Sequence, residues 1–168
     1  GQSYFGNDQF AEFAPGMKIK AWGYNGSTPG PTIEAIEGDR VRILFTNRLP
    51  EHTTIHWHGI LLPSGMDGVG GLTQPHIQPG ETWAYEFTLR QHGTHMYHPH
   101  GDEMVQLASG MMGLFIIHPR DAAAERVDRD FALMLAQSGA QLPSVVHLRA
   151  GGLRPAKLRA QVLSALRG

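Results

Sequence analysis

The sequence contains no cysteine among its 168 residues. This absence excludes disulfide bonds, thiolate nucleophiles, zinc–thiolate sites, iron–sulfur clusters and cysteine-ligated blue copper from this chain. Its 14 Lys and Arg residues nearly balance its 15 Asp and Glu residues, which argues against a nucleic-acid partner held by phosphate contacts and against a polybasic membrane anchor. No apolar run reaches the roughly 18 residues of a membrane-spanning helix, so no membrane span is predicted.

Glycine, proline and histidine are abundant, with 21, 11 and 10 residues respectively. Many glycine and proline residues favour short strands and turns over long helices. The histidine content is the outstanding feature of the composition, because neutral imidazole is a ligand for zinc, copper, iron and nickel. The first four residues, GQSY, lack the charged and apolar regions of a signal peptide, which leaves export of the protein open.

Alternating apolar and polar residues predict a series of short strands. The predicted strands cover residues 17–22, 32–36, 41–45, 53–58, 82–89 and 113–117. Their spacing and their glycine and proline punctuation predict an all-β sandwich or barrel rather than a sheet of alternating strands and helices. Residues 104–112 are apolar at helical spacing and predict one short helix. The glycine- and proline-rich residues 62–80 form a long loop, and such loops are usually functional or mobile.

The C-terminal part of the chain differs in charge from the rest. No acidic residue follows Asp130, whereas several basic residues do. The apolar residues of this part that can share one helix face are Leu158, Val162, Leu163 and Leu166. We expect a basic C-terminal helix that packs on the domain or is frayed in solvent, with binding to an anionic surface or partner as the alternative.

Two His-X-His sequences, His56-Trp57-His58 and His98-Pro99-His100, are the strongest local signal. Positions i and i+2 of a strand point to the same face, so each sequence can aim two imidazoles into one small volume. Neutral imidazoles arranged in this way predict a transition-metal site. The spacing alone does not distinguish such a site from exposed histidines in a histidine-rich chain.

The residues around both pairs resemble a known family. Residues 53–59 (TTIHWHG) match the first copper motif of multicopper oxidases such as laccases, and residues 93–100 (GTHMYHPH) resemble the second. Further segments resemble the N-terminal cupredoxin domain of the same family: residues 22–26 (WGYNG), 29–33 (PGPTI), 37–39 (EGD) and 78–85 (QPGETWAY). The resemblance covers about residues 20–120 in order.

This resemblance implies a cupredoxin-like Greek-key β-sandwich, to which the charge pattern adds a short C-terminal helix. It implies a cupredoxin-like domain over residues 1–136 and leaves residues 137–168 as a basic tail, which we expect to be helical. Because the family acts outside the cytoplasm, the resemblance also implies a periplasmic or secreted protein.

The resemblance also implies that copper is the metal. In the family, the residue corresponding to His56 binds the type-2 copper ion, and the residues corresponding to His58, His98 and His100 bind the type-3 pair. Together these ions form a trinuclear centre that reduces dioxygen to water.

The sequence departs from the family pattern in two respects. It lacks the cysteine of the blue-copper site, and no H-x-x-H-x-H segment follows His100. The resemblance therefore implies half of the ligands, to be completed by a second cupredoxin domain or by a homo-oligomer with a two-fold interface at the metal site. Whether the chain is itself an oxidoreductase stays open, and the alternative is a non-catalytic copper or zinc binding or storage module.

Three acidic residues near the histidines are candidates for a proton relay or for orienting a ligand imidazole: Asp67, Asp102 and Glu103. The competing interpretation is that they are solvated turn residues. His95 is a weaker ligand candidate, and the methionines around the second motif are expected to pack in the core.

Overall fold

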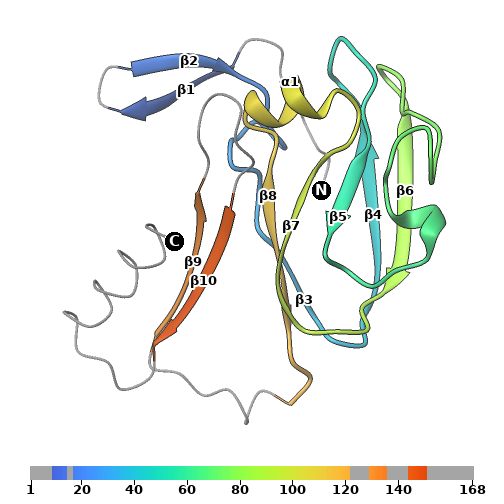
Figure 1. Cartoon of the computed structure of the whole chain (residues 1–168), viewed down its shortest axis with the longest axis vertical. Helices are drawn as coiled ribbons and strands as arrows, with labels where there is room; N and C mark the ends of the chain where they lie inside the picture. Colours follow the sequence, from blue (N-terminus) through green and yellow to red (C-terminus); the bar gives the residue numbers. More distant parts are fainter. Residues whose placement is uncertain (1–8, 15–16, 122–128, 136–143, 151–168) are drawn as a thin grey trace.

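The computed structural model describes residues 9–14, 17–121, 129–135 and 144–150 (Figure 1). These residues form mostly strands, with one short α-helix and one 3-10 turn, η1, at Ser64–Met66. The predominance of strands confirms the all-β expectation. No helix among the described residues is long and apolar enough to cross a membrane.

The larger sheet has the strand order β3-β8-β7-β5. Its members are β3 (Ile33–Ile36), β8 (Gly113–His118), β7 (Gly93–Pro99) and β5 (Ile55–His58). β3 pairs with β8 in parallel, whereas the β8–β7 and β7–β5 pairs are antiparallel. This order brings two segments some forty residues apart in the sequence side by side at one end of the sheet.

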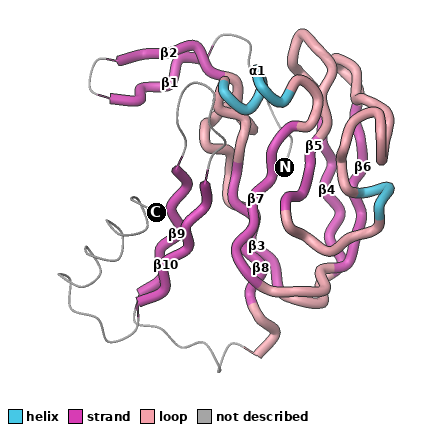
Figure 2. The backbone as a smooth tube through the Cα atoms, viewed as in Figure 1, coloured by secondary structure: helices cyan, strands magenta, loops and turns pink. Residues whose placement is uncertain are grey.

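The second sheet pairs β4 (Arg40–Thr46) with β6 (Thr82–Thr88) in antiparallel register. Tyr85 and Phe87 alternate with more exposed positions in β6, so their side chains enter the core. Trp57 of β5 meets both rings, at centroid distances of 5.2 Å and 5.6 Å. The two sheets therefore close a sandwich around an aromatic core, as Figure 2 shows for the backbone.

Two further antiparallel pairs lie outside these sheets: β1 (Gln9–Ala14) with β2 (Met17–Ala21), and β9 (Arg129–Leu135) with β10 (Ser144–Ala150). β10 is a strand within the region that the sequence assigned to a helical tail, so the helical expectation is wrong for these residues. The expected apolar helix face at residues 158–166 lies outside the described residues.

The short helix α1 covers Glu103–Ala108 and is shorter than the predicted span of 104–112. It begins at Asp102, whose side chain accepts a hydrogen bond from the backbone nitrogen of Val105 as an N-cap. It ends before Gly110, which has a φ of 109° that is unfavourable for residues with a Cβ atom. Apolar spacing did not reveal this stop, because the residues after the turn continue into the core.

A small apolar layer covers the outer face of β7. Met96 of β7 packs with Leu107 of α1 and Met112, and Met134 of β9 packs against this group. β7 is therefore covered on both faces, and four consecutive residues at its end are buried. Met96, Met111 and Met112 are core packing, as expected from the sequence, whereas the same expectation is wrong for Met104, which is exposed.

Candidate metal centre

Strand register brings the two histidine pairs together. β5 and β7 are antiparallel neighbours, and His56 lies directly opposite His98. Residues directly opposite each other point to the same face of a sheet, and so do residues two apart on one strand. His58 therefore lies on the same face as His56 and His98, while Trp57 and Tyr97 between them point into the core.

Three of the four histidines form one compact group of nitrogen atoms. One ring nitrogen each from His56, His58 and His98 lies within 4.8 Å of the others. Nδ1 of His58 and Nε2 of His98 are 3.2 Å apart. His100 is adjacent: its ring centroid is 5.7 Å from that of His56 and 6.4 Å from that of His98.

The long loop holds the first histidine in place. Nδ1 of His56 donates a hydrogen bond to the backbone carbonyl of Asp67 at 2.7 Å. Because a carbonyl oxygen only accepts, Nδ1 carries the proton and Nε2 keeps its lone pair. A carboxylate oxygen of Asp67 lies 3.5 Å from the same Nδ1. The loop therefore selects the tautomer of His56 that offers Nε2 to a metal.

The second pair is held by its own strand and by α1. His98 is only 4 % exposed, and its Nδ1 donates to the carbonyl of Pro99 at 2.9 Å. The pKa of His98 is lowered from 6.5 to about 4, chiefly by burial and also by His56 and His58, while the Pro99 carbonyl and Glu103 oppose the shift. His98 is therefore neutral at physiological pH and offers Nε2 toward His58.

Glu103 stands next to both histidines of the second motif. One carboxylate oxygen lies 3.8 Å from Nδ1 of His98, and the other lies 3.8 Å from Nε2 of His100. Asp102 is different, because its carboxylate caps α1. Of the three acidic candidates, the structure thus places Asp67 and Glu103 beside the imidazoles and gives Asp102 a structural contact.

The donor set fits copper. His56 and His98 each donate Nδ1–H to a backbone carbonyl, which leaves the Nε2 lone pair of each ring available to a metal. Nδ1 of His58 points toward Nε2 of His98. Nitrogen donors of this kind suit copper and zinc, and no thiolate or carboxylate is needed to make the group. Because Nε2 of His98 accepts, Nδ1 of His58 carries the proton that lies between the two rings, and ligation of a metal by this nitrogen would require the loss of that proton.

Three further histidines, His92, His95 and His118, do not belong to this group. His92 and His118 pair with Glu37 and Glu34 on exposed parts of the sandwich. His95 lies beside His58 near Gln91, and burial together with the charge of His58 lowers its pKa. Its Nε2 accepts a hydrogen bond from the amide nitrogen of Gln91 at 3.3 Å, so it is a neighbour of the centre rather than a member.

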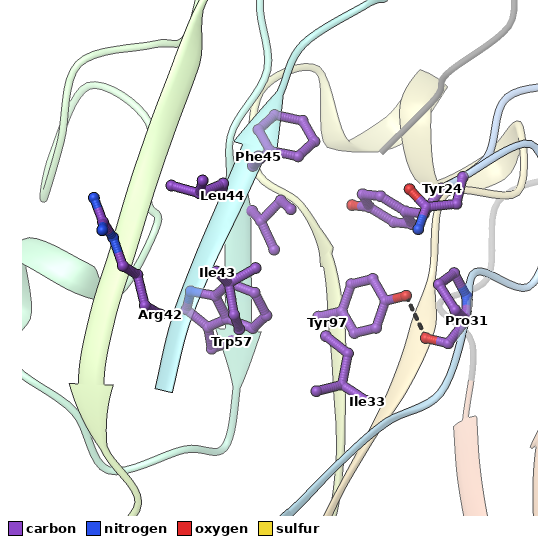
Figure 3. Close-up of a pocket in the computed structure, with 11 residues that line it drawn as sticks. Tyr24, Pro31, Ile33, Arg42, Ile43, Leu44, Phe45, Trp57 and Tyr97 are labelled. Atoms are coloured by element: carbon purple, nitrogen blue, oxygen red, sulfur yellow. Dashed lines mark hydrogen bonds between the residues drawn. The ribbon is translucent and has the colours of Figure 1, made fainter. Parts of the chain in front are cut away.

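On the opposite face of β5 and β7 lies a cavity of about 280 Å³ that is partly open to solvent, with the exposed Leu44 of β4 among its lining residues (Figure 3). Phe45, Trp57 and Tyr97 are among its lining residues, and no histidine is. The Tyr97 hydroxyl donates to the carbonyl of Pro31 at 2.7 Å across the end of this space. The cavity is thus separated from the histidine face by the strands themselves.

Sequence reasoning missed the backbone atoms that support the first motif. The carbonyl of Asp67 accepts from His56 and joins the loop to β5. The next residue, Gly68, has a φ of 82°, and its carbonyl accepts a hydrogen bond from the Thr54 hydroxyl at 2.5 Å. The glycine in the D-G pair was the available signal, because a positive φ at that point requires glycine.

Comparison with known proteins supports copper as the metal of the histidine group. Residues 8–122 match the family model described as multicopper oxidase. The chain is 41% identical over 121 residues to copper resistance protein A of Escherichia coli and 44% identical over 117 residues to L-ascorbate oxidase of Brassica rapa subsp. pekinensis. These alignments cover 72% and 67% of the chain, but in each case only 20% of the relative.

The structural comparison agrees. The fold resembles the crystal structure of a multi-copper oxidase from Pseudomonas thermotolerans with a TM-score of 0.65 and 41% sequence identity, covering 71% of this chain and 28% of that one. The chain spans about a fifth of the length of the curated relatives that it matches. The cupredoxin-like sandwich expected from the sequence is confirmed, and the chain belongs to the multicopper oxidase family, as one of its cupredoxin domains.

Proposed function

We propose that this domain supplies half of the histidine ligands of a trinuclear copper centre that reduces dioxygen to water. In this proposal His56 is a type-2 ligand, and His58, His98 and His100 are type-3 ligands. The observation that carries the proposal is the register of β5 and β7, which places His56 opposite His98 and gathers three ring nitrogens within 4.8 Å.

Copper, when bound, supplies the one-electron chemistry that dioxygen reduction needs. The protein's own residues keep the ligands neutral and oriented: the Asp67 and Pro99 carbonyls hold the Nδ1–H groups of His56 and His98. Asp67 and Glu103 lie where carboxylates can exchange protons with the site. Asp102 belongs to the proposed relay with weaker support, because its carboxylate caps α1.

The remaining ligands come from a second cupredoxin unit. Either a further domain or a second copy of this chain faces the histidine surface, and a two-fold arrangement of two copies would bring together two identical sets. The names of the relatives fit copper handling: one is a copper resistance protein, and another is an ascorbate oxidase. We extend the proposal to a periplasmic or secreted location, as the family resemblance implies.

Copper titration tests the ligand assignment. We expect His56→Ala and His98→Ala to weaken copper binding by roughly a hundredfold or more, because each removes a direct ligand and second-sphere changes alone cost 10–100-fold. His118→Ala is the matched control, since His118 pairs with Glu34 away from the group. Equal copper affinity in all three variants would contradict the proposal, provided that circular dichroism shows each variant folded.

Completion of the centre is tested separately. Sedimentation with and without copper reports whether copies of the chain associate, and an oxygen electrode reports turnover with a phenolic substrate. We expect little turnover from this chain alone, because it holds no cysteine for a blue-copper electron relay. Rapid turnover by the isolated chain would overturn the half-centre assignment.

A non-catalytic copper or zinc binding module is the second candidate, and the same lack of cysteine favours it. It predicts stoichiometric metal uptake without oxygen consumption, even when a complementary cupredoxin domain is added. Oxygen consumption that appears only on that addition would instead support the trinuclear assignment.

A further inference from the structure

A second histidine pair lies outside the group described above. Thr53 and Ile77 form an isolated antiparallel bridge, with each backbone nitrogen donating to the other residue's carbonyl. Both side chains are buried. His52 and His76 each precede one member of this bridge, which makes them diagonal neighbours across the two segments.

The two imidazoles are in direct contact. Their ring centroids are 4.3 Å apart with an interplanar angle of 61°. His52 is exposed and His76 is half-buried, so solvent ions have access to the pair. Two nitrogens bound to one ion, each at about 2.0–2.1 Å, lie at most about 4.2 Å apart, a separation that side-chain rotation of two rings at this spacing can reach.

The pair borders the candidate centre. A Cβ atom at Gly70 would lie 2.6 Å from Nε2 of His76 and 2.9 Å from the carbonyl oxygen of His100, so one glycine separates the two. On the other side, the His52 carbonyl would lie 3.1 Å from a Cβ at Gly101. His52 and His76 therefore sit at the rim of the surface that carries the first group.

We propose that His52 and His76 form a separate, exchangeable binding site for a borderline divalent ion, Cu²⁺ or Zn²⁺, at the entrance to the histidine surface. Two imidazoles without a charged ligand bind such ions more weakly than a fuller ligand set does, and an accessible pair exchanges them with solvent. The inference does not depend on the trinuclear assignment, because none of its ligands belongs to the first group.

The surroundings of His76 favour this role. Burial, and to a smaller extent His52, lowers the pKa of His76, so its imidazole is neutral and available to a metal at neutral pH. The competing explanation is ring packing alone, in which the contact stabilises the Thr53–Ile77 bridge and no ion binds. The two explanations differ in whether substitution of either ring removes a metal equivalent.

The test uses the full chain with the first group disabled by His56→Gln and His58→Gln, both on the edge strand β5. In this background we expect calorimetry to detect one weakly bound Zn²⁺ ion per chain. We expect electron paramagnetic resonance to show a Cu²⁺ signal with nitrogen ligands. Adding His52→Ala or His76→Gln should lower the affinity for this weakly bound ion by roughly tenfold or more, because even the loss of a residue outside the ligand set costs 10–100-fold in metal affinity. Adding His118→Gln is the matched control and should leave it unchanged.

A second arm covers failure of the doubly substituted background to fold. In the otherwise unaltered chain, His76→Gln should remove the weaker metal equivalent and leave the tighter one. An unchanged number of equivalents in both arms would overturn the proposal and establish ring packing alone. Loss of the tight equivalent together with the weak one would also overturn it, since the pair would then not be separate from the first group.

Discussion

The two His-X-His motifs share a spacing but not an environment. The first lies on the edge strand β5, where His56 is half-buried, His58 is exposed and a loop residue holds the ring in place. The second lies on β7, which is covered on both faces, and His98 is only 4 % exposed. Identical spacing thus fixes which way the rings point, whereas the layers around each strand decide how firmly they are held.

The largest expected effect comes from breaking the loop that supports the first motif. Gly68→Ala places a Cβ atom against the backbone carbonyl of Ile55 at a φ of 82°. Left-handed strain and overpacking together should lower the free energy of unfolding by about 3 kcal/mol or more. Urea denaturation of the metal-free protein measures the change.

Two glycines in the same loop separate these causes. Gly65 has open space around it, and Gly80 has open space but a φ of 85°. Gly65→Ala should leave the free energy of unfolding nearly unchanged. Gly80→Ala should lower it by about 1–2 kcal/mol, the effect of left-handed backbone strain without overpacking. If Gly68→Ala were no more destabilising than Gly80→Ala, the contact with Ile55 would not constrain the loop.

The second motif should make the metal-free protein sensitive to acid. The pKa of His98 is about 4 in the folded state and 6.5 in the unfolded chain. As the pH falls, the unfolded state therefore binds a proton at His98 before the folded state does. The contribution of His98 to the free energy of unfolding is thus constant above pH 6.5 and is lost as the pH falls from 6.5 toward 4. The full loss is at most about 3 kcal/mol.

Urea denaturation at a series of pH values, with a chelator present, measures how the free energy of unfolding depends on pH. His98→Gln removes the titrating group and should flatten the curve between pH 6.5 and pH 4. His118→Gln, on the exposed end of β8, provides the matched control for substituting a histidine. An unchanged slope in His98→Gln would show that other groups govern the acid sensitivity.

The same contrast explains what the sequence could and could not predict. Alternation located β3, β4, β5, β6 and β8 of the sandwich but not β7. The His-X-His spacing predicted that the rings of each pair share a face, and the structure gathers His56, His58 and His98, because that spacing depends on strand periodicity. Support by the Asp67 carbonyl was not predictable, since a backbone atom leaves no mark on residue type. β10 was missed because basic charge suggested a helical tail, while its β-branched residues pair with β9.

A smaller effect is expected at the carboxylate beside the second motif. Glu103→Gln removes the charge that lies 3.8 Å from ring nitrogens of both His98 and His100. Loss of such an outer partner should weaken copper binding by roughly tenfold. Glu34→Gln, which removes a carboxylate from His118 on the surface, is the control and should leave the copper affinity unchanged. Equal affinities for both variants would mean that Glu103 does not act on the ligands.

The smallest effect is expected at the corresponding carboxylate of the first motif. Asp67→Asn leaves the backbone carbonyl that accepts from Nδ1 of His56 at 2.7 Å and changes only a side chain 3.5 Å away. The tautomer of His56 is therefore retained, and copper affinity in a competition titration should change less than the roughly tenfold expected for Glu103→Gln. A larger loss for Asp67→Asn would show that charge, rather than the loop backbone, orients the edge-strand histidine.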